Sequence, residues 1–421
     1  MHINSDLIEK YKKIIFKNEI YLLTSLSFVG NASKFVNSLL DSHDELFTCP
    51  HSVNNILTIS HEEKLKFKRN DFSYLKGDNF NKIIKKNDYL FNTKNDEYHR
   101  GYNHLGENFD KYIKLDKEKF IFLFESLIKT LKSSENNLKN QLLTFFICFN
   151  WCQNFYPKSN KFIIYTHDPA NSIIVQNILK SAKYLSTSRY PINAYATRMR
   201  NRFLKNTIMV PMIDFYDQIH HHYDFCKIKD DIGVVIIEEL HNTPEDSLKK
   251  LCKHLNINYS NQLLQTTVCN ITWHNNRRNI YTGFDINRHN FINTKEVPIY
   301  LVKKFSSKIP NFLNYLGYPH IENKLKINEY LSFIFFINKY FLKYITQSVV
   351  NIFRANISIK TKIYYLLKFL KEFSFSIFYT IFSKKKLNQT FITDEKEDFK
   401  NKLLIINPFS ENIYNKKLDT K

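Results

Sequence analysis

An apolar, β-rich run at residues 20–29 is followed by five residues that could bind a ligand: Gly30, Asn31, Ala32, Ser33 and Lys34. The run predicts a buried strand, and the helical spacing of the apolar residues after residue 34 predicts a helix. A tight turn between a strand and a helix directs free backbone N–H groups and the positive end of the helix dipole at an anion. The pattern is therefore compatible with an anion site, and an ordinary strand-to-helix turn is the alternative.

Cysteine and histidine groups offer a second kind of chemistry. Cys148 and Cys152 lie one helical turn apart beside Trp151, which fits core packing or, alternatively, a metal or redox pair. The His run at residues 220–222 has no matching ligand cluster nearby, so we expect a solvated or partner-facing loop and no metal. Six scattered cysteines in a chain of this length predict free thiols in a reducing compartment.

The elements that must position these residues alternate between strands and helices. Further strands are predicted at residues 161–165, 184–188 and 233–237, with helical patterns between them. Asp168 with Pro169, and Thr243 with Pro244, mark helix starts. This alternation predicts an α/β fold, a parallel doubly wound sheet flanked by helices.

Net charge is the most conspicuous bulk property of the chain. Its 421 residues include 61 Lys and Arg against 40 Asp and Glu, for a net charge of +21. A positive net charge of this size is compatible with binding to nucleic acid, to an anionic membrane or to a phosphorylated small molecule. No nucleic-acid recognition motif is present, so we expect no nucleic-acid partner.

The C-terminal third differs in composition from the rest. Residues 330–382 are rich in Phe, Tyr, Ile and Leu but are interrupted by Lys too often for a spanning helix. This pattern predicts basic amphipathic helices that lie on an anionic membrane surface or pack on protein. We expect an α/β domain at residues 1–325, this helical extension at 326–385 and a polar tail at 386–421. The N-terminal residues lack the apolar core of a signal peptide, so we expect a cytoplasmic protein, peripheral on the membrane if the extension binds lipid.

The order of the segments resembles the sulfotransferases that use 3′-phosphoadenosine-5′-phosphosulfate (PAPS), especially the branch that modifies protein tyrosines and carbohydrates. The resemblance spans residues 20–319 and depends on the order of several short phrases. In chain order these are residues 28–30 with 37–43, residues 188–191 with Thr197, residues 238–240 with 244–245, and residues 312–318.

The resemblance implies a P-loop-like sulfotransferase fold, PAPS as co-substrate and no metal. The donor's 5′-phosphosulfate would lie against Gly30, Asn31, Ala32, Ser33 and Lys34. Its 3′-phosphate would be held by Arg189 and Thr197, and Trp273 with Arg277 and Arg278 lies where relatives fold a loop over the donor. A surface ion pair for Arg189 and plain helix surface for Thr197 are the alternatives.

The 5′ loop departs from the family pattern because it is about three residues shorter. Gly30 stands where the family has a basic residue, so Lys34, in the first helical turn, is the candidate to replace it. Counting ten residues from Asp41 places His51 at the position of the family's general base, and a His accepts a proton near neutral pH. His167 lies near another family position and either contacts substrate or caps a turn.

We therefore expect sulfuryl transfer from PAPS to a hydroxyl of a carbohydrate, lipid or other small acceptor, in line and assisted by His51 and Lys34. One alternative is a non-catalytic membrane-surface or scaffold protein on a degenerate sulfotransferase fold. The other is a transferase that uses a different nucleotide donor.

Overall fold

A computed structural model of the chain describes chiefly residues 3–26, 32–57, 87–94, 104–166, 169–191, 231–276, 310–318 and 403–408, with shorter stretches between them. The chain divides into two compact units. The first unit comprises Met1–Ser188, Lys229–Arg288 and Leu403–Asn407, and the second comprises Arg189–Ile228, His289–Lys402 and Pro408–Lys421.

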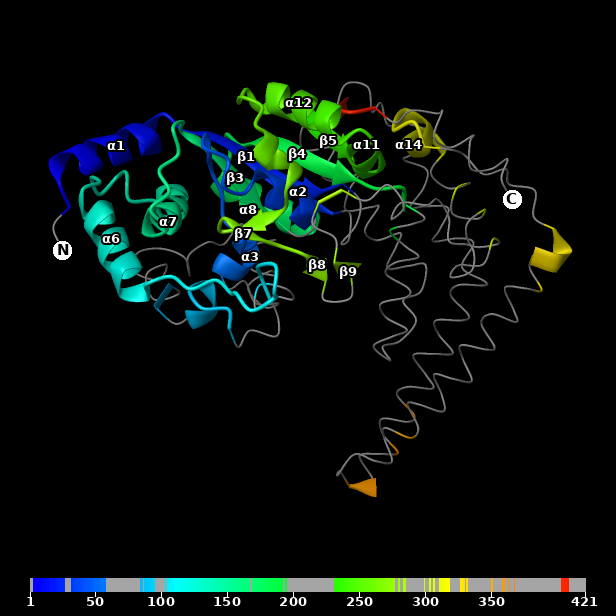
Figure 1. Ribbon diagram of the computed structural model, residues 1–421, viewed down its shortest axis with the longest axis horizontal. Coiled ribbons are helices and arrows are strands. Elements are labelled where there is room, and N and C mark those ends of the chain that lie inside the picture. Colours follow the sequence, from blue (N-terminus) through cyan, green and yellow to red (C-terminus); the bar gives the residue numbers. More distant parts are fainter. Residues whose placement is uncertain are drawn as a thin grey trace. The chain divides into compact units, whose positions relative to one another are not determined.

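The first unit is built on a six-stranded parallel sheet in the order β10-β5-β4-β1-β3-β2 (Figure 1). Central β1 pairs with β3 on one side and with β4 on the other. The strands are β1 (Glu19–Ser25), β2 (Leu46–Phe47), β3 (Lys161–Tyr165), β4 (Lys183–Ser188), β5 (Ile232–Ile236) and β10 (Leu403–Ile405). The parallel α/β sheet predicted from the sequence is confirmed.

The strand order changes direction at β1. After β1 the chain adds β2 and β3 on one side, then crosses to add β4 and β5 on the other. In open parallel sheets, ligands bind outside the carboxyl ends of the strands at such a switch point. The segments that follow β1 and β4 are therefore the places to look for a site.

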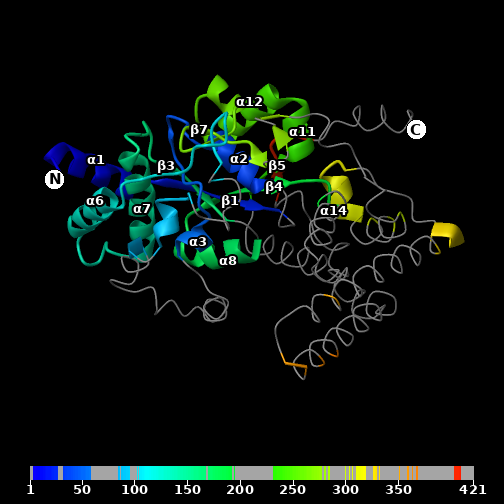
Figure 2. The ribbon, with the colours of Figure 1, turned by 60° about the horizontal axis from the view of Figure 1, so that its bottom comes forward.

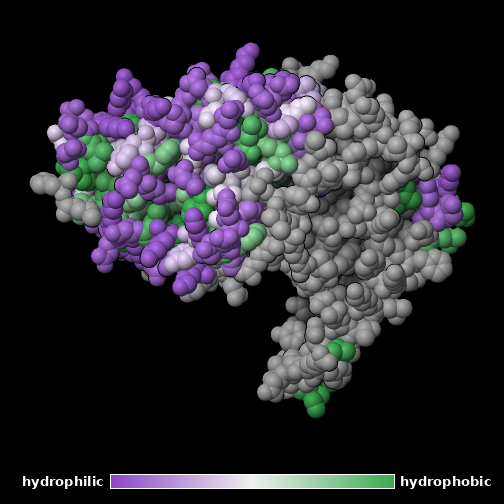
Figure 3. Space-filling view, viewed as in Figure 1, coloured by the Kyte–Doolittle hydropathy of each residue, from purple (hydrophilic) through white to green (hydrophobic). Residues whose placement is uncertain are grey.

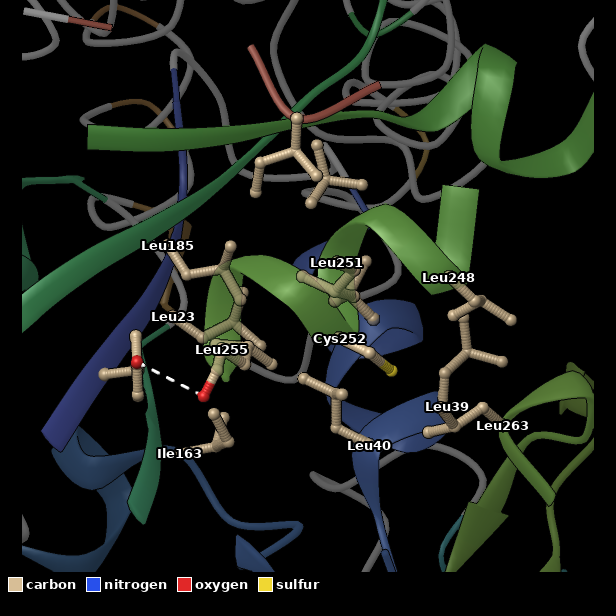
Figure 4. Packing of buried hydrophobic residues seen from close by; sticks show 14 of the residues in the cluster. Leu23, Leu39, Leu40, Ile163, Leu185, Leu248, Leu251, Cys252, Leu255 and Leu263 are labelled. Carbon is tan, nitrogen blue, oxygen red and sulfur yellow. Dashed lines mark hydrogen bonds between the residues drawn. The ribbon is translucent and has the colours of Figure 1, made fainter. Parts of the chain in front are cut away.

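One face of the sheet is covered by α2 (Ser33–Leu40), α11 (Ile237–Asn242) and α12 (Pro244–Leu255). Leu39 and Leu40 of α2 belong to the same buried cluster as Leu251 and Leu255 of α12, all four labelled in Figure 4 and fully or almost fully buried. Burying one Leu side chain is worth about 1.5–3 kcal/mol. This packing fixes where α2 begins, and with it the position of Lys34.

The opposite face is covered mainly by α7 (Leu138–Cys152) and α8 (Pro169–Ile178), as Figure 2 shows for α8. Phe146 of α7 contacts Phe162 of β3, and the Ser172 hydroxyl of α8 donates to the Thr24 hydroxyl of β1 at 2.6 Å. Helices α1 (Ser5–Phe16) and α6 (Lys117–Lys129) pack against α7. Both faces of the sheet are thus buried, as expected for a parallel sheet.

Several short elements lie outside the six-stranded sheet. They are α3 (Val53–Ile56), the 3₁₀ turns η2 (Asp88–Leu90) and η3 (Asn261–Leu264), and the antiparallel pairs β6 (Thr267–Val268) with β7 (Ile271–Thr272) and β8 (Asn275–Asn276) with β9 (Asn279–Ile280). A small apolar cluster of Tyr102, Leu105, Ile113, Val268 and Trp273 joins the segment at residues 102–113 to the β6–β7 hairpin and the residue after it.

Strand β10 corrects one expectation. The sequence assigns residues 386–421 to a polar tail, yet Leu403–Ile405 pair in parallel with β5. The Asn407 side chain continues this pairing, because its Oδ1 accepts from the Ile236 N–H at 2.7 Å and its Nδ2 donates to the Ile236 carbonyl at 2.9 Å. The strand is only three residues long, so its composition alone gives no signal.

The second unit contains α14 (Pro310–Tyr315), which is followed by Gly317 in the left-handed conformation with φ 74°. Most of the predicted amphipathic extension, residues 326–385, lies outside the described residues. Within the part of the chain that is described, no helix combines the length and apolar character needed to cross a membrane. In the view of Figure 3 the coloured surface of the first unit is mostly hydrophilic.

The five cysteines that the structure describes are free. Cys148 is buried and Cys152 is partly exposed, and burial raises the pKa of both thiols, that of Cys152 to about 12. Thiols with raised pKa values are poor metal ligands and poor nucleophiles, which favours the core-packing interpretation of this pair. Cys226 and the His run at residues 220–222 lie outside the described residues.

Candidate functional site

The candidate site begins at the turn between β1 and α2. Ala32 precedes the helix in the left-handed conformation, with φ 61° and ψ 22°, and its side chain does not cap the helix. The hydroxyl oxygens of Ser25, at the end of β1, and Ser33, at the start of α2, lie 3.1 Å apart. A helix start without a side-chain cap retains N–H groups for a ligand. Gly30 and Asn31, predicted to line the same turn, lie outside the described residues.

Lys34 extends from the first turn of α2 into a corner formed by two aromatic rings. Its Nζ lies 3.9 Å from the centroid of the Tyr102 ring and 4.9 Å from that of Trp273. The two rings are 6.3 Å apart and inclined at 60° to each other. Ring faces attract an ammonium group, but burial opposes its charge and lowers the pKa of Lys34 to about 7. Both protonation states of this amine are therefore accessible near neutral pH.

Hydrogen bonds hold the two rings in place. The Tyr102 hydroxyl donates to the Pro50 carbonyl at 2.7 Å. The backbone N–H of Trp273 donates to the Thr266 carbonyl at 3.0 Å, and the Thr266 hydroxyl donates back to the Trp273 carbonyl at 2.8 Å. Gly106 N–H donates to the Thr272 carbonyl at 2.8 Å, which joins the two ring-bearing segments. The corner is thus a fixed frame around the Lys34 amine.

Asp41 anchors the other end of α2 to the same frame. Its buried carboxylate accepts hydrogen bonds from the hydroxyls of Ser42 at 2.9 Å, Thr267 at 3.0 Å and Thr48 at 3.3 Å, and from the Asn270 N–H at 3.3 Å. Burial raises the pKa of Asp41 although these hydrogen bonds oppose the rise. The helix that carries Lys34 is therefore fixed to the β6–β7 hairpin that carries Trp273.

His51 lies close to this corner and is fully buried. Its Nε2 is 3.1 Å from the Leu90 carbonyl, and because a carbonyl only accepts, Nε2 carries the proton and Nδ1 the lone pair. The rings of Tyr89, Tyr102 and Phe149 pack edge-on around it at 6.0–6.2 Å. The predicted base and Lys34 thus both contact the Tyr102 ring.

The predicted 3′-phosphate residues are only partly described. Arg189 is half-buried and directly follows β4 in the chain, where it begins the second unit. Thr187, near the end of β4, pairs with Ser25 at the end of β1. The segment that leads from β1 to Lys34 and the segment that leads from β4 to Arg189 therefore start side by side. Thr197, Arg277, Arg278 and His167 lie outside the described residues.

Sequence reasoning missed Tyr102, which stands far from Lys34 in a covering segment without a motif. Trp273 was assigned to a covering loop, and the sequence carries no signal of its contact with Lys34. Trp273 and His274 are both buried, and among the described residues the indole Nε1 and the His274 Nδ1 have no hydrogen-bond partner. These two polar atoms lie in the loop between β7 and β8, beside the corner.

One group of potential metal ligands lies in the described part of the chain. His43, Asp44 and Glu45 place ligand atoms within 4.8 Å of one another. Each is already engaged: His43 Nε2 with the Asn258 carbonyl at 2.9 Å, Asp44 with Lys158 at 2.6 Å, and Glu45 with the Asn258 N–H at 2.8 Å. These contacts explain the cluster as a surface network.

No family model matches this chain, and no curated protein matches it. Among solved structures it is similar to a sulfotransferase domain from the curacin biosynthetic pathway, with 16% identity and a TM-score of 0.31 over 68% of this chain and 90% of that one. It is also similar to sulfotransferase STF9 from Mycobacterium avium, with 12% identity and a TM-score of 0.31 over 61% of this chain and 69% of that one. At these values the similarities carry no argument about activity, which must come from the site itself.

Proposed function

We propose that the chain is a sulfotransferase that moves a sulfuryl group from PAPS to a hydroxyl of a carbohydrate, lipid or other small acceptor. The observation that supports this most is the position of Lys34. It places an amine beside the uncapped start of α2, at the switch point of a parallel sheet. Helix starts and adjacent cations are the groups that bind phosphate and sulfate oxygens.

In this proposal, the chain's own groups divide the work of the transfer. The S–O bond to the donor phosphate breaks as a new S–O bond forms to the acceptor oxygen. The Lys34 ammonium and the N–H groups at the start of α2 stabilise negative charge on the donor oxygens. His51 accepts the proton that the acceptor hydroxyl loses. Arg189 holds the 3′-phosphate of the donor, as a charge-assisted and bidentate contact.

The binding test uses recombinant full-length protein and 3′,5′-diphosphoadenosine in a calorimeter. We expect binding, and a loss of about tenfold or more in affinity for Arg189→Ala and for Lys34→Met, the loss typical of a charged hydrogen bond. Lys158→Met is the matched control, because this exposed lysine pairs with Asp44 on the surface. If the wild-type protein shows no binding of the nucleotide, the proposal is wrong.

Turnover is tested separately with radiolabelled PAPS and a panel of hydroxyl acceptors. We expect His51→Gln to lower turnover by about 10²- to 10⁴-fold, the usual contribution of a general base, with little change in nucleotide affinity. If the His51→Gln variant binds the nucleotide and turns over PAPS like the wild type, His51 is not the general base. The proposal that the chain binds the donor would be unaffected.

The setting of the reaction is also a proposal. We propose a reducing, cytoplasmic environment, supported by the free thiols of the described residues. We further propose that residues 326–385 bind an anionic membrane surface. Flotation with phosphatidylserine vesicles tests this, and equal recovery with neutral vesicles would contradict it.

A further inference from the structure

The Trp273 indole N–H is a buried donor that the fold does not use. The side chain is 1% exposed, and its Nε1 has no hydrogen-bond partner among the described residues. Most buried polar atoms in proteins are hydrogen-bonded, so an exception needs an explanation. One explanation is that its partner belongs to a ligand.

The surroundings of this indole indicate the chemistry of that ligand. The ring lies 4.9 Å from the Lys34 Nζ, so a cationic donor and a neutral donor share one corner. The ring faces serve the ammonium, whereas the N–H edge of an indole is electropositive and requires an acceptor. An indole N–H and a neighbouring ammonium are both groups that donate to an anionic oxygen.

A second indole in the chain provides a comparison. Trp151 in α7 is also buried with an unpartnered Nε1 among the described residues, but its ring packs against Tyr156. The aromatic corner of Trp273 holds the Lys34 amine next to the start of α2. The argument therefore depends on the unused donor together with this cation, and not on the unused donor alone.

We propose that the Trp273 indole N–H is a binding residue of the site and donates to an oxygen of a tetrahedral oxyanion, phosphoryl or sulfuryl, held beside Lys34. The inference rests on the proposed function, because it assigns Trp273 to the same ligand site. It adds a donor from the β7–β8 loop to the donors at the start of α2.

The test compares Trp273→Phe with Trp151→Phe in the full-length protein. The first change keeps an aromatic ring beside Lys34 but removes the N–H, and the second removes the matched indole away from the site. Affinities for 3′,5′-diphosphoadenosine and for inorganic pyrophosphate are measured by calorimetry. We expect Trp273→Phe to lose about tenfold or more, as for a hydrogen bond to a charged group, and Trp151→Phe to change affinity by less than about twofold.

A second readout measures ligand binding in the wild-type protein, and a variant is needed only to assign the signals. The chain has two tryptophans, so a ¹⁵N spectrum contains two indole N–H signals, and Trp151→Phe assigns them. We expect the Trp273 signal to move downfield when either probe binds and the Trp151 signal to stay in place.

The outcomes separate the two proposals. If the nucleotide binds but Trp273→Phe keeps its affinity and the indole signal does not move, the inference is overturned and the proposed function stands. If pyrophosphate binds with dependence on Trp273 while the nucleotide does not, the inference stands and the proposed function fails. If neither probe binds, the inference is overturned as well.

Discussion

Replacing Lys34 by Met should stabilise the first unit while it weakens anion binding by about tenfold or more. Met keeps the length and apolar stem of lysine without its charge. In the folded protein, burial lowers the pKa of Lys34 to about 7, whereas an unfolded lysine has a pKa of about 10.4. A group that binds its proton more weakly when folded destabilises the fold wherever the unfolded chain is protonated.

The magnitude follows from the difference between these two pKa values. A factor of ten in proton affinity corresponds to about 1.4 kcal/mol, so the full cost of charging the buried amine is at most about 4.5 kcal/mol. Lys34 retains part of its solvent exposure, and attraction to the two ring faces offsets roughly 1 kcal/mol. We therefore expect Lys34→Met to raise the free energy of unfolding by about 2–3 kcal/mol at pH 6.

The pH dependence has a definite sign. Below pH 7 the amine is charged in both states, and the destabilisation is complete. Between about pH 7 and pH 10 the unfolded chain binds the proton that the folded protein has lost, so wild-type stability rises with pH. The advantage of Lys34→Met over the wild type should therefore shrink steadily across this range.

Urea unfolding at half-unit steps from pH 6 to pH 9 measures this difference, with Lys158→Met as the exposed control. We expect the control to differ from the wild type by less than about 0.5 kcal/mol at every pH. A Lys34→Met variant that is less stable than the wild type at pH 6, or a difference that grows with pH, would refute the reasoning about burial.

Three further changes test the frame around the site, each by urea unfolding. Asn407→Ala should cost about 1–3 kcal/mol, because it leaves the backbone groups of β5 that it pairs with buried and unsatisfied, whereas Leu404→Thr on the exposed side of β10 should cost under 1 kcal/mol. Asp41→Ala should cost about 2–4 kcal/mol, since several donors lose their common acceptor; a cost below 1 kcal/mol would contradict that role. Tyr11→Phe should cost about 1 kcal/mol through loss of the 2.8 Å hydrogen bond to Thr144, and an unchanged midpoint would show that the bond contributes nothing.

Much of the α/β fold could be predicted because local patterns encode it. The β3 range 161–165 coincides with the predicted strand, and the start of α8 at Pro169 follows from the helix-start chemistry of proline. The C-terminal strand could not be predicted, because Leu403–Ile405 become a strand only through pairing with β5. Pairing between segments so distant in the chain leaves no local periodicity to detect.

The site was predictable in part for the same reason. Lys34 is local to the β1–α2 turn, so the strand-to-helix pattern is enough to make it a candidate. Its surroundings are not local, because Tyr102 and Trp273 reach it from segments with no regular pattern. The full burial of His51 likewise depends on rings contributed by other segments, which a count of residues from Asp41 cannot show.

Two helices on the same face of the sheet illustrate where function overrides local stability. Helix α12 follows the local rules of charge and termination: Pro244 starts it, acidic residues occupy its first turn, basic residues its last, and Asn256 ends it in the left-handed conformation. Helix α2 breaks these rules, with an alanine at the cap position, no acidic residue in its first turn and Lys34 at the positive end of its dipole. Such departures are expected where a site requires them. An anion bound at the start of α2 would supply the negative charge that the sequence omits there, so the binding energy of the ligand and the local instability of the helix have one common cause.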